Sequence, residues 1–188
     1  MMLRRTESSP YGSVRELIAA AEIQAAQRLR YTVWQSEGVV IHDTEREAIA
    51  DHHDDHATHW AVFDGDQIVG AARLCLHDEL AEAPDAEMYV GVDIPSPVAS
   101  MNRLVVLKSY RGQGIGGLLD QVRIQKAREL GAHTVVIAPV NVNSRKQSLR
   151  KMGFQVRSEV TGRAKWSPTV EICACYLILD QIEAVENV

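Results

Sequence analysis

The sequence predicts an α/β fold built on a mixed β-sheet with helices on both sides. Residues 64–66 form an Asp-Gly-Asp turn between the apolar stretches 60–63 and 67–76, a pattern typical of an antiparallel hairpin. Further along, strand and helix patterns alternate between residues 101 and 152, which indicates parallel strands joined by a crossover helix. A sheet that contains both kinds of connection is mixed.

The N-terminal half begins with a short strand and a helix. Residues 14–18 predict the strand, and residues 21–36 carry their apolar side chains on one side of a helix, with Gly38 just past its end. Residues 37–58 are polar and loop-like. Residues 78–99 contain three prolines and predict an irregular connection that is long enough to cover a site.

The C-terminal half alternates strands and helices. The predicted elements, in order, are a strand at 101–107, a helix at 115–130, a strand at 134–140, a helix at 144–152 and a final apolar strand at 170–179 that closes the sheet.

Size and charge limit the class of protein. The 188 residues are 46% apolar and contain no linker, repeat or uncharged run of 18 apolar residues, so we expect one domain over 1–188, no membrane partner and a cytoplasmic location. The net charge of −5 divides unevenly: residues 1–99 hold 7 Arg against 18 acidic residues, and residues 100–188 hold 13 basic against 7 acidic residues. The basic half suits a polyphosphate ligand, whereas we expect no nucleic-acid partner.

The three cysteines, Cys75, Cys173 and Cys175, have no CxxC spacing, and we expect buried thiols. The segment 51–59, Asp-His-His-Asp-Asp-His-Ala-Thr-His, contains metal-ligand side chains, but its spacing matches no metal motif. We therefore expect a solvated acidic loop and no metal.

The most informative stretch is Arg-Gly-Gln-Gly-Ile-Gly-Gly at 111–117, between an apolar strand and an amphipathic helix. Glycine costs about 1 kcal/mol relative to alanine in a helix, so four glycines at one helix start need a reason. Without side chains, phosphate oxygens can reach the unpaired N–H groups of the first helical turn, where the helix dipole also favours anions. Arg111 adds a charged donor.

The same glycines also satisfy GxGxxG, the dinucleotide-binding pattern, through Gly112, Gly114 and Gly117. That kind of site needs an acidic residue about 20 residues later, on the following strand, to hold a ribose hydroxyl. The strand at 134–140, Thr-Val-Val-Ile-Ala-Pro-Val, has none. The pattern therefore favours a different phosphate-binding loop.

With this loop, the strand before it, Ala-Pro-Val-Asn-Val-Asn at 138–143 and Lys-Met-Gly-Phe at 151–154, the chain resembles the GNAT superfamily of acyl-CoA-dependent N-acyltransferases. The resemblance covers roughly residues 60–180. It implies the GNAT fold, with a mixed sheet of six or seven strands and helices on both faces. It also implies acetyl-CoA or another acyl-CoA as cosubstrate.

The resemblance further implies how the coenzyme is bound. Backbone N–H groups of the loop would hold the pyrophosphate, main-chain groups of the preceding strand would contact the pantetheine arm and the thioester oxygen, and Asn143 would contact the arm. The cofactor-binding residues are then Leu104, Val105, Val106, Arg111, Gly112, Gln113, Gly114, Ile115, Gly116, Gly117 and Asn143.

The catalytic acid and base remain open. Leu149 stands where many members carry a tyrosine that protonates the departing thiolate, and Ser100 stands where many relatives carry a glutamate base. Candidate replacements for the base are His59, His77, Glu87 and Asp93, beside Ser100 itself. No nucleophile and base pair is visible in the sequence, so we expect a ternary complex without a covalent acyl-enzyme.

A second resemblance lies upstream, in Arg30 to Gly38, the acidic and histidine residues of 51–59, Arg73-Leu74 and Asn102-Arg103-Leu104. These residues resemble the GNAT branch of acyl-homoserine-lactone synthases and long-chain N-acyl amino acid synthases. The resemblance implies that Arg30, Trp34, Arg73 and Arg103 border the acceptor or support its site. The branch commonly uses acyl carrier protein, whereas the intact 111–117 loop favours acyl-CoA.

The sequence thus predicts an N-acyltransferase that moves an acyl group, in the first instance acetyl, from acyl-CoA to a primary amine of a small molecule or peptide. A long-chain N-acyl amino acid or homoserine-lactone-type synthase and a catalytically silent acyl-CoA sensor are the alternatives. We expect a monomer or homodimer.

Overall fold

The computed structural model describes residues 14–39, 47–165 and 167–179. Seven strands form one sheet in the order β1-β2-β3-β4-β5-β7-β6. The strands are β1 (Val14–Leu17), β2 (Thr58–Asp64), β3 (Gln67–His77), β4 (Val98–Val106), β5 (Thr134–Ile137), β6 (Gln155–Ala164) and β7 (Ser167–Ile178). The α-helices are α1 (Ala20–Ser36), α2 (Ile115–Glu129) and α3 (Asn143–Lys151), and the 3-10 turns are η1 (His52–His56), η2 (Leu80–Glu82), η3 (Ala86–Tyr89) and η4 (Lys108–Tyr110).

The pairing confirms the mixed α/β sheet. Strands β1, β2 and β3 pair antiparallel, which includes the predicted hairpin at 64–66. Strand β4 pairs with β5 in parallel, as the crossover pattern predicts, and β7 pairs antiparallel with both β5 and β6. Among the described residues, no helix is long and apolar enough to cross a membrane.

The chain divides into two compact units. The first unit comprises Met1–Leu74 and Asn102–Arg123, and the second comprises Cys75–Met101 and Ile124–Val188. The expectation of one domain over 1–188 stays a prediction.

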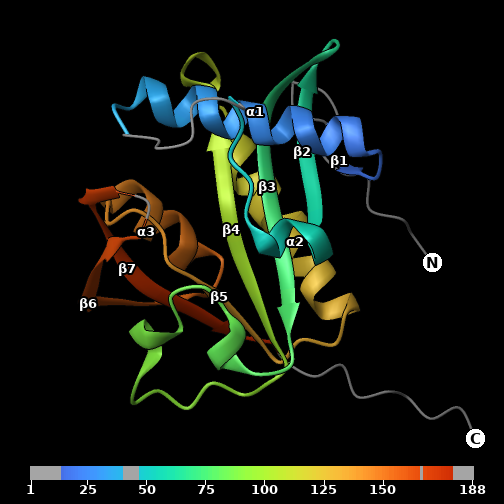
Figure 1. Cartoon of the computed structure of the whole chain (residues 1–188). Helices are drawn as coiled ribbons and strands as arrows, with labels where there is room; N and C mark the ends of the chain where they lie inside the picture. Colours follow the sequence, from blue (N-terminus) through green and yellow to red (C-terminus); the bar gives the residue numbers. More distant parts are fainter. Residues whose placement is uncertain (1–13, 40–46, 166, 180–188) are drawn as a thin grey trace, which may run out of the picture. The chain divides into compact units, whose positions relative to one another are not determined.

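In the first unit, helices cover both faces of the strands, as predicted. Helix α1 lies across β2 and β3 with α2 behind them (Figure 1). On the α1 face, a cluster contains Leu17, Ala26, Leu29, Val33, Ala61, Ala71 and Val105. On the α2 face, the chain needs glycine at position 70, because a Cβ there would lie 2.8 Å from Ile115 Cγ2. This close approach seats the start of α2 directly on β3.

The second unit has its own core, made mainly of Met88, Tyr89, Val98, Val136, Ile172 and Ala174. The buried hydroxyl of Tyr89 donates to the carbonyl of Cys175 at 3.1 Å. Cys75, Cys173 and Cys175 are buried free thiols, which confirms the sequence prediction.

Three expectations about the C-terminal half were wrong in detail. Strand β4 begins at Val98 rather than residue 101, and β5 ends at Ile137, with only an isolated bridge at Val140. The edge strand β6 was missed because its sequence, Gln-Val-Arg-Ser-Glu-Val-Thr-Gly-Arg-Ala, lacks a continuous apolar face. Strand β7 therefore lies between β5 and β6 instead of closing the sheet.

Candidate active site

The glycine-rich loop at 111–117 leads directly into α2. Gly112 and Gly114 have φ values of +78° and +84°, a backbone conformation that side chains other than glycine rarely adopt. The amide of Leu118 donates to the carbonyl of Gly114 at 3.0 Å. The amides before it lie in the first turn, where an α-helix offers no acceptor of its own.

The two glycines inside that first turn leave the backbone bare. A Cβ added at Gly117 would meet nothing within 4 Å, and one added at Gly116 would meet only Leu104 Cδ2, at 3.9 Å. Neither glycine is therefore required by packing in the described structure. A ligand that approaches these amides closely would explain why glycine occupies both positions.

Arg111 stands beside the loop with its side chain 43% exposed. Its Nε donates to the carbonyl of Val106 at 3.1 Å, and its NH1 lies 2.9 Å from a Glu37 carboxylate that is equally exposed. An exposed pair of this kind contributes about 0–1 kcal/mol, so a phosphate can replace Glu37 as the partner at little cost.

Strand β4 carries the other predicted coenzyme residues of the first unit. Val105 is buried in the α1-side cluster, and Leu104 and Val106 are half-buried. Just before them, Arg103 adopts φ +56°, which interrupts the regular alternation of the strand. A non-glycine residue held in this conformation is strained, and strain of this kind clusters at functional sites.

In the second unit, the beginning of β4 pairs with three of the four residues of β5. The parallel register runs from Val98 opposite Thr134 to Ser100 opposite Val136. Asn143, predicted to contact the coenzyme arm, is the first residue of α3 and follows the end of β5 by six residues.

Five charged residues of the first unit form what we call the arginine–aspartate network: Arg30, Asp51, Asp54, Arg73 and Arg103. Arg30 NH1 donates to Asp54 Oδ1 at 2.8 Å. Arg73 NH1 donates to Asp51 Oδ1 at 2.6 Å and lies 3.0 Å from Asp54 Oδ1. Arg103 Nε donates to Asp51 Oδ2 at 3.1 Å, and its NH2 donates to the same oxygen. The network thus ties α1, η1, β3 and β4 together.

The network has a closed end and an open end. Arg30 and Arg73 are fully buried, and the Asp54 side chain is only 5% exposed. Arg103 is partly exposed, and its guanidinium lies over the Trp34 ring, 5.2 Å from the centroid. The two predicted acceptor residues that a ligand could reach are therefore Trp34 and Arg103.

A second buried ion pair supports the network from α2. Arg123 NH2 donates to Asp120 Oδ1 at 2.5 Å, and both side chains are fully buried. Arg123 NH1 also donates to the carbonyls of Arg73 and Asn102, at 3.2 and 3.3 Å. These bonds fix the main chain of β3 at Arg73 and that of β4 at the residue before Arg103.

The network shifts the pKa values of its two aspartates and of the neighbouring His59. Burial alone would raise the pKa of Asp51, but the hydrogen bond from Arg73 and the charge of Arg103 hold it well below its usual range. The pKa of Asp54 is also lowered, because Arg30 and Arg73 outweigh its burial. Burial and the charge of Arg30, whose NH2 lies 3.2 Å from the ring, lower the pKa of His59. At neutral pH the carboxylates are therefore charged and His59 is neutral.

The expectation that residues 51–59 form a solvated acidic loop was wrong for Asp51 and Asp54. Asp51 caps η1 by accepting from the amide of His53 at 3.0 Å, and this turn presents both carboxylates to the arginines. Only the part of 37–58 that is described, residues 37–39 and 47–58, can be compared with the prediction.

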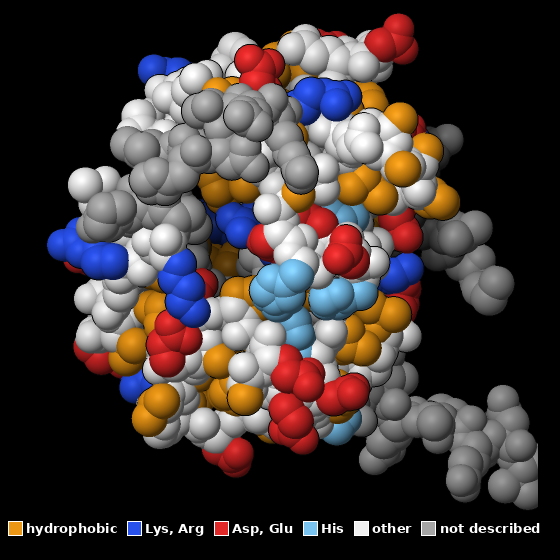
Figure 2. Space-filling model, in the orientation of Figure 1, with side chains coloured by type: hydrophobic (Ala, Val, Ile, Leu, Met, Phe, Trp, Pro, Cys, Tyr) orange, Lys and Arg blue, Asp and Glu red, His pale blue; other side chains and the backbone are white. Residues whose placement is uncertain are grey.

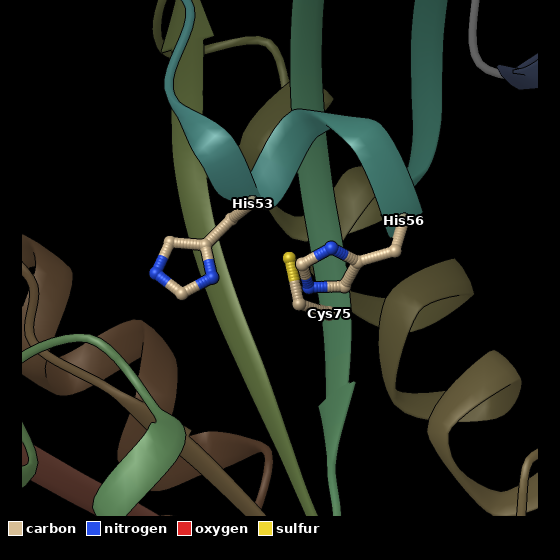
Figure 3. Close-up of side chains that lie close together, drawn as sticks. All are labelled: His53, His56 and Cys75. Carbon is tan, nitrogen blue, oxygen red and sulfur yellow. The ribbon is translucent and has the colours of Figure 1, made fainter.

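The same turn contains His52, His53 and His56. Histidine side chains gather on the face seen in Figure 2, and those of His52 and His56 are exposed. His53 and His56 both project from η1, with ring centroids 5.8 Å apart (Figure 3). Cys75, drawn with them, belongs to the second unit. The expectation of no metal here stays a prediction.

The candidate catalytic residues fall into different environments. In the second unit, His77 Nε2 lies 2.8 Å from Ser100 Oγ, and both residues are buried. Glu87 is exposed and lies 3.1 Å from Lys165 Nζ. Asp93 is also exposed, and Leu149 is fully buried. Of these candidates, only His77 and Ser100 are brought together, in a hydrogen bond between imidazole and hydroxyl that the sequence did not reveal.

Sequence reasoning included the acidic residues of 51–59 in the upstream resemblance but gave Asp51 and Asp54 no role, and it missed Asp120 and Arg123. One available signal was the spacing of Asp120 and Arg123, which puts both on the apolar side of α2 beside Leu119 and Ile124. Another was the three-residue spacing of Asp51 and Asp54, which matches a capping box.

Comparisons with known proteins identify the family of the chain. A model of the acetyltransferase (GNAT) family matches residues 20–154. No match to the chain was found among curated proteins.

Several solved structures share the fold. They include FeeM, an N-acyl amino acid synthase from uncultured soil microbes, with 17% identity, a TM-score of 0.63 and coverage of 88% of this chain and 90% of that one. MesI, a CoA-dependent acyl-homoserine lactone synthase, has 17% identity, a TM-score of 0.64 and 88% coverage of both chains. A GCN5-related N-acetyltransferase from Kribbella flavida has 19% identity, a TM-score of 0.59 and coverage of 89% and 97%. At these identities the likeness concerns the fold.

Proposed function

The chain belongs to the acetyltransferase (GNAT) family and is an acyltransferase, and from this premise we propose that it transfers an acetyl group from acetyl-CoA to a primary amine of a small molecule or peptide. We also propose that the enzyme is cytoplasmic, that it acts as a monomer or homodimer, and that it needs no metal.

The observation that carries the proposal is the glycine-lined start of α2. Gly112 and Gly114 hold the turn in positive-φ conformations, and Gly116 and Gly117 leave the first-turn amides open. Such amides, at the positive end of a helix, bind phosphate groups. We assign the pyrophosphate of acyl-CoA to the N–H groups of residues 113–117, with Arg111 exchanging Glu37 for a phosphate oxygen.

The preceding strand supplies the rest of the donor site. We assign the pantetheine arm and the thioester oxygen to main-chain groups of Leu104, Val105 and Val106, and a further contact with the arm to Asn143. An N–H aimed at the thioester oxygen stabilises the charge that develops there during attack, by about 3 kcal/mol. Holding the amine next to the thioester supplies much of the remaining acceleration.

On the acceptor side, the network divides into two roles. Arg30 and Arg73 are fully buried and paired with aspartates, which favours a supporting role. Trp34 and Arg103 lie at the open end and are assigned to contact the acceptor. A substitution at Trp34 or Arg103 is therefore expected to raise the KM for the amine more than the KM for acetyl-CoA.

A second candidate function is long-chain acyl transfer to an amino acid or a homoserine-type acceptor. Two observations favour it: the network joins residues of the upstream resemblance, and FeeM and MesI share the fold. Donor choice separates the two candidates, because a long-chain enzyme prefers octanoyl-CoA or decanoyl-CoA to acetyl-CoA.

The direct test is thiol release from acetyl-CoA and from decanoyl-CoA across a panel of primary amines, amino acids and peptides. The proposal predicts amine-dependent release above the buffer rate, with product mass increased by the acyl group. CoA binding without release with any donor or amine would instead favour the acyl-CoA sensor.

A matched pair of variants tests the assignment of the loop. Arg111→Glu is expected to weaken CoA binding by about 10- to 100-fold, because it replaces the phosphate partner with a repelling charge. Arg28→Glu makes the same charge change at an exposed position on α1 and serves as the control. Equal affinity in the two variants would reject the assignment.

A further inference from the structure

The turn η1 repeats its chemistry every three residues. A 3-10 helix has three residues per turn, so side chains three positions apart lie directly above one another. In η1 and its cap, this period places Asp51 with Asp54 and His53 with His56. The two carboxylates hold the arginines of the arginine–aspartate network, whereas the two imidazoles have no role in the assignments above.

The imidazoles of His53 and His56 lie close enough to share one ion. Their ring centroids are 5.8 Å apart, and a ring nitrogen of each lies within 4.8 Å of one on the other. Figure 3 shows both rings on the same side of η1. Imidazole nitrogens bind zinc at about 2.0–2.1 Å, so two of them on one ion lie at most about 4.2 Å apart. A small rotation of the exposed His56 side chain closes the difference.

The backbone of the turn is already fixed by hydrogen bonds. Asp51 accepts from the amide of His53 at 3.0 Å, and Asp54 accepts from the amide of Asp51 at 2.9 Å. Both carboxylates are also bound by buried arginines. Two ligands on such a preorganised backbone lose less conformational entropy on binding than two ligands on a flexible loop.

The surroundings of the two imidazoles suit a transition metal. Imidazole is a good ligand for Zn²⁺, Ni²⁺ and Cu²⁺, whereas Mg²⁺ and Ca²⁺ prefer oxygen ligands. The arginine–aspartate network beside the turn has one positive charge more than it has negative charges, and the exposed carboxylate of Asp55 balances it. A cation at the turn therefore meets no net repulsion from these groups.

We propose that His53 and His56 form a chelating site for one divalent transition-metal ion, with water completing the coordination. The ion links two residues of η1 and so stabilises the turn that presents Asp51 and Asp54 to the arginines. Because the unfolded chain does not hold the two imidazoles together, the ion binds the folded protein more tightly and stabilises it. This inference goes beyond the proposed function and does not depend on it, because acyl transfer is proposed to need no metal. It revises the expectation of no metal at 51–59.

Titration calorimetry with Ni²⁺ on the full-length protein, without an affinity tag, tests the site. The titration is made at a pH of about 7.5, where imidazoles with an ordinary pKa of about 6.5 are mostly neutral. We expect one ion per chain and a loss of affinity of about tenfold or more in His56→Gln. His53→Gln should lose affinity to a similar degree.

His52→Gln is the matched control. His52 is exposed, like His56, and its ring contacts that of His53 with centroids 3.9 Å apart. The three-residue period nevertheless places His52 on a different face of η1. His52→Gln should therefore keep the wild-type affinity for Ni²⁺. An equal loss in His52→Gln and His56→Gln would overturn the proposed pair of ligands.

Thermal unfolding gives a second readout that involves no acyl transfer. Ni²⁺ at about 100 times its dissociation constant should raise the Tm of the wild type by about 5–10 °C, and the shift should be much smaller in His56→Gln. Mg²⁺ at the same concentration should leave the Tm unchanged. A wild-type protein that binds no Ni²⁺, equal affinity in His56→Gln and the wild type, or an equal shift with Mg²⁺ would overturn the metal site. Each of these results would leave the proposed acyl transfer standing.

Discussion

In the first unit, three buried arginines and one exposed arginine differ in what surrounds them. Arg30, Arg73 and Arg123 are fully buried, and each is paired with an aspartate. Arg111 is 43% exposed and is paired with an equally exposed glutamate. A buried guanidinium cannot change partners without leaving an uncompensated charge, whereas an exposed one can exchange partners with water or a ligand.

The comparison teaches that position in the fold, rather than residue type, separates the supporting arginines from the arginine that is proposed to bind a phosphate. The buried arginines tie α1, η1, β3 and β4 together through carboxylates that stay paired with them. The loop at 111–117 keeps its donors at the surface, on backbone that carries no side chains at Gly112, Gly114, Gly116 and Gly117.

The largest effect is expected from breaking the buried group. Asp54→Ala leaves Arg30 without its carboxylate and removes one of two from Arg73, so we expect a loss of about 3–5 kcal/mol in the free energy of unfolding. Asp55→Ala, at the exposed neighbouring position, is the control and should change stability by less than about 0.5 kcal/mol. Denaturant unfolding measures both, and a similar stability for the two variants would contradict a buried network.

A smaller loss is expected where the loop depends on backbone conformation. Gly114→Ala places a side chain at φ +84° without any steric clash, so its cost is conformational, about 1–2 kcal/mol. In Gly116→Ala the new Cβ meets Leu104 only at ordinary contact distance, and the unfolding free energy should stay close to that of the wild type. Equal losses in the two variants would show that the positive φ is not what requires glycine.

The neutral His59 beside the arginine–aspartate network makes stability depend on pH. Because the pKa of His59 is lowered in the folded protein, the unfolded chain binds the proton more readily, and stability falls as pH decreases below about 6.5. His59→Gln removes this contribution, so its loss of stability between pH 8 and pH 5 should be smaller than that of the wild type. A difference of one between the pKa of the folded protein and that of the unfolded chain corresponds to about 1.4 kcal/mol in the free energy of unfolding. Parallel pH curves for the two proteins would argue against a buried neutral His59.

The sequence was sufficient for features that local pattern determines. The hairpin at 64–66, α1, the crossover from β4 to β5 and the loop before α2 all follow from turn residues, periodicity and glycine placement. The second resemblance also grouped Arg30, Trp34, Arg73 and Arg103, which the structure brings into one neighbourhood.

Long-range pairing could not be predicted in the same way. Asp51 and Asp54 lie in a polar segment that offers no arginine nearby in sequence. The arginines that pair with these aspartates are 19 to 52 residues away in sequence. The contact between His77 and Ser100 spans 23 residues and depends on the register of two strands. The polar strand β6 is recognisable only through its pairing with β7.

The most direct test of the central assignment, that bare amides at the start of α2 hold the pyrophosphate of acyl-CoA, is the Gly117→Ala variant. The added methyl group meets no protein atom within 4 Å and sits in a helix, where alanine is favoured by up to about 1 kcal/mol over glycine. We therefore expect unchanged or increased stability together with CoA affinity, measured by calorimetric titration, reduced at least tenfold. A variant that is as stable as the wild type and binds CoA equally well would contradict the account.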